Sequence, residues 1–238
     1  MCIRDRDIMI LEGYGLTETS PVLTASRPDK IRFGSPGIPL SNVELKIASD
    51  GEILAKGPNI MKGYYKSSEL TNEVFNDDGW FKTGDIGEID QDGFLKITDR
   101  KKSLIVTSAG KNIAPAPLES ALTSSDYIEQ ALVIGDKRNF VTALLVPDFE
   151  NIGRFLSDRG KELSSNEAII EHLDVISMID EEVSRVMQKF SKTEQVKKVA
   201  LISRQFLIEK GEMTPKMSIV RKVVESNFED KINNLYEV

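Results

Sequence analysis

The stretch that decides the fold reads Gly-Trp-Phe-Lys-Thr-Gly-Asp at residues 79–85 and Thr-Asp-Arg-Lys-Lys at residues 98–102. Between the two motifs, the pair Asp92-Gly93 separates two runs in which apolar and polar residues alternate. Alternation is typical of half-buried strands, and an Asp-Gly pair supplies the positive φ angles of a tight hairpin turn. This stretch therefore predicts a β-hairpin.

The predicted hairpin brings polar side chains from its two ends together. Asp85 lies at its start and Asp99 just past its end, so we expect two carboxylates at one mouth, with Arg100 beside them. Such a mouth can hold a polyhydroxylated ligand such as a ribose. The alternative for Asp85 is a carboxylate that only caps a turn.

Composition narrows the chemistry that the chain can perform. Its 238 residues are 40% hydrophobic, which suits one large or two small globular domains, and no apolar run is long enough to span a membrane. A net charge of −7 with a pI near 5.0 argues against a nucleic-acid partner. Cys2 is the only cysteine and His172 the only histidine, which excludes disulfides and Cys-rich or His-rich metal sites. The chemistry is therefore expected from Lys, Arg, Thr and carboxylate side chains.

A second motif lies near the N-terminus, where residues 13–19 read Gly-Tyr-Gly-Leu-Thr-Glu-Thr after a short apolar run. A hydroxyl donor and a hard carboxylate ligand are what a magnesium–phosphate group needs. Taken alone, the motif would favour an ordinary strand and turn.

Together, the motifs at residues 13–19, 80–85 and 98–102 resemble those of the adenylate-forming enzymes, which include acyl-CoA synthetases, luciferases and the adenylation domains of peptide synthetases. In that family the aspartate of Thr-Gly-Asp binds the ribose hydroxyls, and the aspartate of Asp-Arg is the hinge between two domains. The resemblance implies the first role for Asp85 and the second for Asp99. It implies further roles as follows: adenine packing for Tyr14, an α-phosphate contact for Thr17, magnesium coordination for Glu18, a ribose contact for Arg100, and nucleotide contacts for Gly13 and Ile97.

The pattern of elements changes near Asp99, where we expect a boundary between two lobes. Before it, residues 43–47 alternate as a half-buried strand does, and the region resembles the barrel-like tail of the family's large AMP-binding domain. After it, strands are predicted at residues 131–134, 141–146 and 199–202, alternating with helices. The expected fold is α/β to α+β: residues 7–98 belong to the large domain, and residues 99–238 form a small mobile C-terminal lobe.

The predicted lobe contains two features that the resemblance interprets. The loop at residues 109–115 leads into a helix from Pro117, and in the family this loop lines the pantetheine tunnel, so Gly110 is a candidate for close approach of the backbone to a ligand. A helical insertion is expected at about residues 150–195, and it resembles the long-chain fatty acyl-CoA synthetase branch. One apolar face of a continuous helix is predicted from Ile169, Leu173, Ile176, Val183, Met187 and Phe190. A last amphipathic helix is predicted over residues 220–235.

The resemblance covers only the rear part of a full-length enzyme. Residues 1–6 do not read as a native start and are interpreted as a scar, and the Ser/Thr/Gly-rich loop that wraps the outer phosphates of ATP is not found in the sequence. We therefore expect a C-terminal fragment of a long-chain fatty-acid–CoA ligase, inactive alone. The parent would use ATP, magnesium, a fatty acid and CoA. The alternatives are another acyl- or aryl-adenylating enzyme and a non-catalytic nucleotide-binding or scaffold module.

The expected location is cytoplasmic, with peripheral membrane contact at most, because the implied substrate partitions into bilayers. The sequence carries no signal for an oligomeric state or an acyl chain length.

The catalytic lysine is where the sequence departs from the family. Related long-chain ligases read Thr-Pro-Thr-Leu-Lys where this chain reads Thr-Pro-Lys-Met-Ser at residues 214–218, so Ser218 occupies the usual lysine position. If the loop is extended, Lys216 points to the same side as Ser218 and can serve as the catalytic lysine. The alternative is a surface lysine at position 216, with the role lapsed or moved to Arg221 or Lys222.

Overall fold

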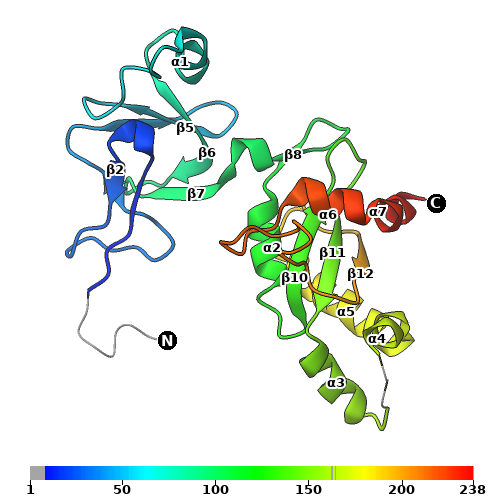
Figure 1. The fold of residues 1–238 in the computed structure, drawn as a ribbon. Helices are drawn as coiled ribbons and strands as arrows, with labels where there is room; N and C mark the ends of the chain where they lie inside the picture. The colour runs from blue at the N-terminus through cyan, green and yellow to red at the C-terminus, as the bar shows by residue number, and fades with distance from the viewer. Residues whose placement is uncertain (1–8, 162, 164, 238) are drawn as a thin grey trace. The chain divides into compact units, whose positions relative to one another are not determined.

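The fold is taken from a computed structural model that describes residues 9–161, 163 and 165–237. The predicted scar at residues 1–6 lies outside the described residues. The chain divides into two compact units, Met1–Ser103 and Leu104–Val238. The first contains mainly antiparallel strands and the second combines a small sheet with helices, so the predicted mixed α/β to α+β class is confirmed (Figure 1).

The first unit contains two antiparallel sheets. One has the order β1-β2-β3 and the other the order β4-β5-β6-β7. The elements of this unit are β1 (Gly13–Gly15), the 3-10 turn η2 (Thr17–Thr19), β2 (Val22–Ala25), β3 (Ile38–Pro39), β4 (Glu44–Ile47), β5 (Glu52–Lys56), helix α1 (Ser68–Val74), β6 (Phe81–Ile89), β7 (Leu95–Arg100) and the 3-10 turn η3 (Lys101–Ser103). Leu23, Val43 and Ala55 form a buried apolar cluster against which Tyr14 and Leu16 pack. These contacts hold the segment of β1 and η2 against this apolar cluster.

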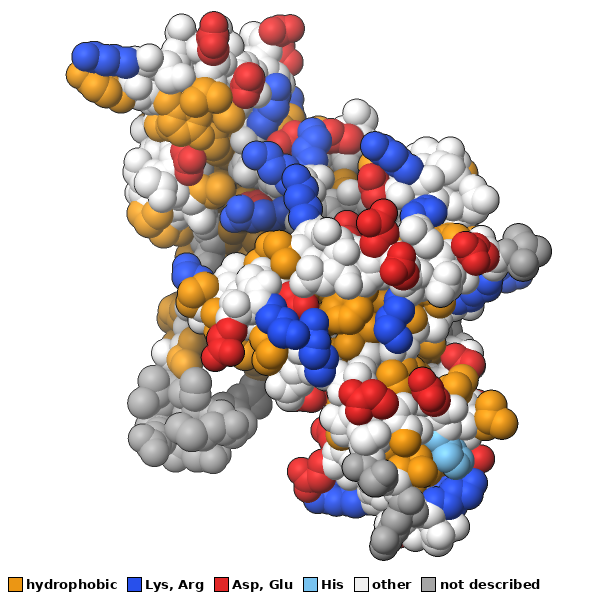
Figure 2. Space-filling view, turned by 45° about the vertical axis from the view of Figure 1, so that its right-hand side comes forward, with side chains coloured by type: hydrophobic (Ala, Val, Ile, Leu, Met, Phe, Trp, Pro, Cys, Tyr) orange, Lys and Arg blue, Asp and Glu red, His pale blue; other side chains and the backbone are white. Residues whose placement is uncertain are grey.

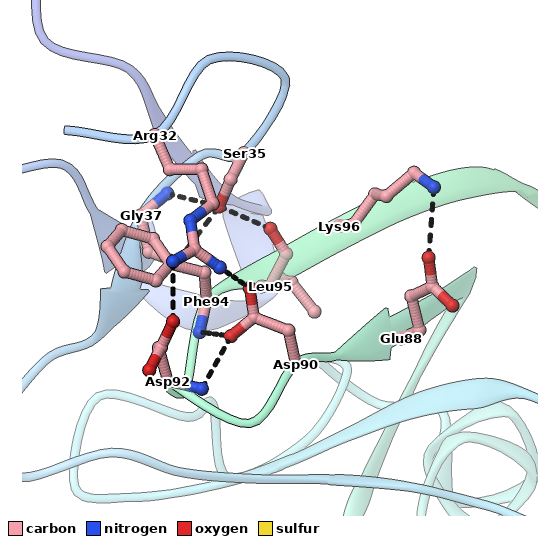
Figure 3. Close-up of polar contacts among 9 residues, drawn as sticks. All are labelled: Arg32, Ser35, Gly37, Glu88, Asp90, Asp92, Phe94, Leu95 and Lys96. Atoms are coloured by element: carbon pink, nitrogen blue, oxygen red, sulfur yellow. Dashed lines mark hydrogen bonds and ion pairs between the residues drawn. The ribbon is translucent and has the colours of Figure 1, made fainter.

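The predicted hairpin is formed by β6 and β7, but the Asp-Gly pair does not supply both of the positive φ angles expected of it. Of the Asp-Gly pair only Gly93 has a positive φ (85°), and the loop spans three residues between Asp90 and Phe94. The Asp90 carboxylate accepts hydrogen bonds from the backbone N–H groups of Asp92 and Phe94, each at 2.9 Å (Figure 3). Arg32 forms ion pairs with Asp90 and Asp92. Because the Asp90 carboxylate accepts hydrogen bonds from two backbone N–H groups of the turn, a single residue with a positive φ is enough to close it.

The predicted end of the hairpin is also corrected. β7 continues through Arg100, and Asp99 pairs with Ile86 inside the strand instead of lying past it. The division between the two units falls after Ser103. The hinge role of Asp99 and the predicted lobe boundary there remain predictions.

The second unit is a three-stranded sheet with helices on both faces. β10 and β11 are antiparallel, and β11 and β12 are parallel. Its elements are β8 (Ile105–Val106), β9 (Asn112–Ile113), α2 (Pro115–Leu122), β10 (Ile128–Ile134), β11 (Thr142–Pro147), α3 (Phe149–Ser157), α4 (Asn166–Glu171), α5 (Leu173–Met187), β12 (Lys198–Leu201), α6 (Arg221–Asn227) and α7 (Glu229–Tyr236). Side chains on one face, such as Val133 and Leu145, pack with α2 and α5, and those on the other, such as Leu132 and Leu144, pack with Phe206, α6 and α7 (Figure 1). A sheet covered on both faces explains the continuous apolar runs at residues 131–134 of β10 and 143–146 of β11.

The predicted continuous helix in the insertion is wrong. The chain is extended at His172 (φ −75°, ψ 126°), whose Nδ1 accepts a hydrogen bond from the Asp174 N–H and so begins α5. This break changes the helical phase. Leu173 and Ile176, both predicted on the buried face, are 77% and 36% exposed, and the buried face of α5 is formed by Val175, Ile179, Val183, Val186 and Met187.

Two smaller predictions about helices also change. The helix predicted from Pro117 begins at Pro115, and the helix predicted over residues 220–235 is divided at Phe228, where φ is −119° and ψ is 24°. No helix within the described residues has both the length and the apolar character needed to cross a membrane. The face drawn in Figure 2 carries Lys and Arg side chains interspersed with Asp and Glu.

Candidate functional site

The centre of the candidate site is the Thr-Gly-Asp segment on β6. The Thr83 hydroxyl donates to the Ile53 carbonyl at 2.7 Å and accepts from the Asp85 N–H at 3.1 Å. Between them Gly84 has a φ of 73°, a conformation that other residues rarely adopt. The segment therefore leaves the regular strand geometry at Gly84, and Thr83 fixes the backbone on which Asp85 is carried.

Asp85 is held between residues from two other strands. Asp85 is only 5% exposed. The Tyr14 hydroxyl on β1 donates to Asp85 Oδ2 at 2.6 Å, and Arg100 Nε on β7 lies 3.3 Å from Oδ1. Arg100 is the cross-strand partner of Asp85, and its side chain is 74% exposed. Burial and the hydrogen bond to Asp85 both raise the pKa of Tyr14 well above its usual range, so the phenol stays protonated and donates.

The turn after β1 carries the next two predicted residues, Thr17 and Glu18. It is fixed by a loop of the same unit: the Met61 N–H donates to the Glu18 carbonyl at 2.8 Å, and the Asn59 amide donates to the carbonyls of Thr19 and Val22. The Tyr64 hydroxyl donates to Glu18 Oε1 at 3.0 Å. Burial and this hydrogen bond raise the pKa of Tyr64. Glu18 is thus oriented through both its backbone and its side chain.

Gly15 has a steric reason to be glycine. A Cβ at this position would lie 1.6 Å from the carbonyl oxygen of Pro21. β1 and the start of β2 therefore approach more closely than any other residue allows, and this approach closes the turn that presents Thr17 and Glu18.

These residues surround one open pocket in the first unit. Its volume is about 860 Å³, and it is lined by Tyr14, Gly15, Leu16, Thr17, Glu18, Pro21, Asp85, Ile97, Thr98, Asp99 and Arg100. The structure thus brings together the predicted residues Tyr14, Thr17, Glu18, Asp85, Ile97, Asp99 and Arg100. Gly13 lies on β1 next to Tyr14 but does not line the pocket.

The lining offers both hydrogen-bond donors and hydrogen-bond acceptors to a ligand. The carboxylate of Asp85 can accept hydrogen bonds from hydroxyl groups. The guanidinium of Arg100 and the hydroxyl of Thr17 can donate hydrogen bonds. Among the described residues, no three His, Cys, Asp or Glu side chains gather closely enough to hold a metal ion by themselves. A single carboxylate such as Glu18 still fits magnesium, because this ion is commonly held by one or two carboxylates together with substrate phosphates and water.

Gly110 and Lys216 belong to the second unit. Gly110 closes a turn by donating from its N–H to the Thr107 carbonyl at 2.8 Å, with a φ of 74°. A Cβ there would meet no heavy atom of the described residues within 4 Å. The backbone conformation, and not a close contact, is what requires glycine at this position in the unit.

The loop that carries Lys216 is not extended. The Thr214 N–H donates to the Ser218 carbonyl at 2.8 Å, the Met217 N–H donates to the Thr214 carbonyl at 2.9 Å, and Met217 has a φ of 63°. Lys216 therefore lies in a tight exposed turn. The argument that a two-residue step places it on the side of Ser218 does not hold, because that argument requires an extended chain.

Arg221, one alternative to Lys216, already forms hydrogen bonds within the second unit. Arg221 Nη1 donates to Glu119 Oε1 at 2.6 Å, and its other guanidinium nitrogen donates to the Val133 carbonyl. The same Glu119 oxygen accepts from the Val133 N–H at 2.8 Å. Arg221 thus joins α6, α2 and β10 as a structural residue of the second unit.

Two protein-family models match the chain. A family model described as the AMP-binding enzyme C-terminal domain matches residues 102–238, and one described as AMP-binding enzyme matches residues 2–65. The first match alone covers more than half of the chain. The chain belongs to the AMP-binding enzymes.

Several relatives carry the name of one reaction. The long-chain-fatty-acid–CoA ligase FadD15 of Mycobacterium bovis is 39% identical over 234 residues, which are 98% of this chain and 39% of that protein. The long-chain-fatty-acid–CoA ligase ACSBG2 of Xenopus laevis is 34% identical over 254 residues, covering 97% of this chain and 34% of that protein. The chain thus spans about two fifths or less of the length of these relatives.

The solved structures agree at the level of the fold. The O-succinylbenzoate coenzyme A synthetase of Bacillus subtilis in complex with AMP is 28% identical with a TM-score of 0.63, covering 92% of this chain and 41% of that one. The adenylation domain of a carboxylate reductase from Mycobacterium chelonae has a TM-score of 0.70 at 24% identity, covering 95% of this chain and 34% of that one.

Three residues near the site were not found from the sequence of this AMP-binding enzyme. They are Tyr64, which holds Glu18, and the ion-paired residues Glu52 and Lys101. Tyr64 lies in the region that the resemblance assigns to the barrel-like tail of the large domain. Lys101 belongs to the basic run at residues 100–102, which the sequence alone predicts to be solvated. Its partner Glu52 is 49 residues away. A sequence carries no local signal for such distant pairs.

Proposed function

We propose that this chain forms part of the nucleotide site of a long-chain-fatty-acid–CoA ligase. The proposal is supported by the unfilled capacity of the Asp85 carboxylate. A carboxylate has about four acceptor positions, and within the described residues two side chains, Tyr14 and Arg100, reach this one. The carboxylate faces an open pocket, and the two neighbouring hydroxyls of a ribose are a matching pair of donors.

The remaining lining residues suit the other parts of ATP. Tyr14 offers a half-buried aromatic surface for the adenine, Thr17 a hydroxyl for the α-phosphate, and Arg100 a second contact for the ribose. Glu18 would help to hold magnesium, which when bound neutralises charge on the phosphate oxygens. Ile97 and Gly13 complete the proposed nucleotide contacts.

The proposed reaction has two steps. An oxygen of the fatty-acid carboxylate attacks the α-phosphorus of ATP, the bond to the β-phosphate oxygen breaks, and pyrophosphate leaves. The CoA thiolate then attacks the carbonyl carbon of the acyl-adenylate, and AMP leaves as the acyl–oxygen bond breaks. Asp99 is proposed as the hinge between these steps and Gly110 as a contact near CoA. Both steps depend on positioning and on stabilisation of charge, without a protein nucleophile.

Nucleotide binding by the chain itself tests the site. In isothermal titration, Asp85→Asn should weaken AMP binding by about 10- to 100-fold, the range expected for hydrogen bonds to a charged group. Glu88→Gln is the matched control, since Glu88 is exposed on the same strand and pairs only with the exposed Lys96 among the described residues. Equal AMP affinity in the wild type and Asp85→Asn would contradict the proposal.

The substrate and the activity of the chain alone need separate measurements. The 238 residues with ATP, magnesium and palmitate are expected to release pyrophosphate only at background, and turnover above background would refute this expectation. A second candidate is another acyl- or aryl-adenylating enzyme, since a structural neighbour at 28% identity is an O-succinylbenzoate coenzyme A synthetase. In the complete enzyme, faster pyrophosphate release with an aromatic acid than with palmitate would favour that candidate.

A further inference from the structure

Glu52 is a buried carboxylate for which the proposed reaction has no use. It is the first residue of β5, and its side chain is only 6% exposed. A charged group this deeply buried is costly unless it is paired and hydrogen-bonded. Its partners therefore indicate why the first unit contains it.

Each oxygen of Glu52 has a different partner. Oε1 accepts the Gly84 N–H at 3.0 Å, and Oε2 accepts Lys101 Nζ at 2.7 Å. Lys101 Nζ also lies 2.7 Å from Asp50 Oδ2. The hydrogen bonds that Lys101 donates to Asp50 and Glu52 raise the pKa of Lys101, and the one to Asp50 lowers the pKa of Asp50. Lys101 thus forms a bridge between two carboxylates at the start of β5.

The two partners of Glu52 flank the proposed ribose contacts. Gly84 precedes Asp85 on β6, and Lys101 follows Arg100 at the end of β7. Asp85 and Arg100 are themselves cross-strand partners. One buried carboxylate therefore holds the residue before one ribose contact and the residue after the other.

The position of Gly84 gives this contact a geometric consequence. With a φ of 73°, Gly84 turns the chain away from the regular ladder, and its N–H is satisfied by a side chain. The charged acceptor makes that hydrogen bond stronger than a neutral one. The backbone from which the Asp85 side chain projects is thereby fixed by Thr83 on one side and by Glu52 on the other.

We propose that Glu52 and Lys101 are positioning residues of the nucleotide site, which set the Asp85 carboxylate and Arg100 for the two ribose hydroxyls. This inference rests on the proposed function. Neither residue lines the pocket, so both act through their neighbours and not on the nucleotide.

The experiment compares two ligands on the whole chain. AMP carries both ribose hydroxyls and 2′,3′-dideoxy-AMP carries neither, so the ratio of their affinities reports how well Asp85 and Arg100 meet the hydroxyls. In Lys101→Met and Glu52→Gln this ratio should fall about three- to tenfold, the size of one net hydrogen bond. Lys101→Arg, which keeps the charge, should restore most of the ratio.

Lys102→Met is the matched control. Lys102 is exposed in the same turn and forms no ion pair within the described residues. It should keep the wild-type ratio. Fluorescence of Trp80, the only tryptophan and a residue of the first unit, verifies that each variant is folded, and Lys101→Met is the principal variant because the Lys101 side chain is 43% exposed.

The outcomes separate this inference from the proposed function. A wild-type chain that binds both nucleotides equally would overturn the proposed ribose site and this inference with it. A wild-type chain that prefers AMP, together with unchanged ratios in Lys101→Met and Glu52→Gln, would overturn this inference alone. An equal loss for both nucleotides would assign the two residues a purely structural role, and so would also overturn it.

Discussion

Asp85 in the first unit and Glu212 in the second are both buried carboxylates, but their surroundings differ. Glu212 is fully buried and has four hydrogen-bond donors around it: two from Arg204 at 2.7 Å each, one from the Asn227 amide at 2.9 Å and one from the Leu207 N–H at 3.0 Å. Asp85 has two partners among the described residues and faces an open pocket. Every acceptor position of Glu212 is filled, whereas Asp85 has positions to spare.

The comparison separates a structural carboxylate from one suited to bind a ligand. Burial and charge alone do not tell the two roles apart, because both residues are buried carboxylates. The number of filled acceptor positions does, because a saturated carboxylate has nothing left to offer a ligand. Glu212 holds the segment that leads into the turn of Lys216, and its own backbone carbonyl accepts the Val220 N–H at 2.8 Å.

The largest effect is expected where the saturated carboxylate loses its charged partner. Arg204→Met leaves Glu212 buried without its ion pair, and breaking such a pair costs about 3–5 kcal/mol of stability. Urea unfolding followed by far-UV circular dichroism should show this loss in the helical second unit, while Trp80 fluorescence, which reports on the first unit, should change little. The control is Arg154→Met, whose pair with Glu150 is exposed and worth at most about 1 kcal/mol.

A loss no greater than that of Arg154→Met would show that Glu212 does not depend on Arg204, and the contrast with Asp85 would lose its structural half.

The next largest effect is expected on catalysis, at Lys216 in the turn that Glu212 supports. In the complete enzyme, Lys216→Ala should slow adenylate formation by about 10²–10³-fold, roughly 3–4 kcal/mol, if Lys216 supplies the charge at the α-phosphate. Thiolysis of supplied acyl-adenylate should be spared. The measurement is single-turnover pyrophosphate release, with Lys210→Ala as an exposed control on the same segment. An unchanged rate in Lys216→Ala would rule this residue out and would favour Lys222, because Arg221 is engaged by Glu119.

The sequence predicted the framework of the first unit well because its signals are local. Alternation predicted β6 and β7, and the resemblance to the adenylate-forming enzymes implied that Tyr14, Thr17, Glu18 and Asp85 serve one site. Errors arose where a local signal had two solutions. The Asp-Gly pair fits both a two-residue and a three-residue turn, and the hydrogen bonds of Asp90 decided between them.

The second unit shows why the remainder could not be predicted. Apolar spacing continues through His172, so a pattern alone gives one helix, whereas the extended backbone at that residue divides it. The first unit gives a second example: Lys101 and Lys102 look alike in a basic run, but only Lys101 pairs with Glu52 and Asp50. Such differences depend on contacts between distant segments.

Acid should weaken the second unit through Glu212. Its ion pair with Arg204 lowers the pKa of Glu212 from 4.5 to about 2. A carboxyl whose pKa is lower in the folded state stabilises the fold fully above pH 4.5, and this contribution is lost as the pH falls toward 2. The expected loss over this window is about 2–3 kcal/mol. Glu212→Gln should be less stable than the wild type at pH 7, yet lose less stability between pH 4.5 and 2; parallel profiles would contradict the assignment.

The smallest effect is expected at Asp85, which sharpens the contrast with Glu212. Asp85→Asn keeps an oxygen that can accept the Tyr14 hydroxyl, and the charge it loses faces an Arg100 side chain that is 74% exposed. Because water screens the charge of the exposed Arg100, the pair is expected to contribute at most about 1 kcal/mol, so unfolding of the first unit, followed by Trp80 fluorescence in urea, should shift by less than this amount. The same variant is expected to lose most of its AMP affinity, so function and stability would separate at this residue. A stability loss as large as that of Arg204→Met would instead make Asp85 a structural carboxylate, because a residue kept for a ligand contributes its interactions to the complex and not to the empty fold.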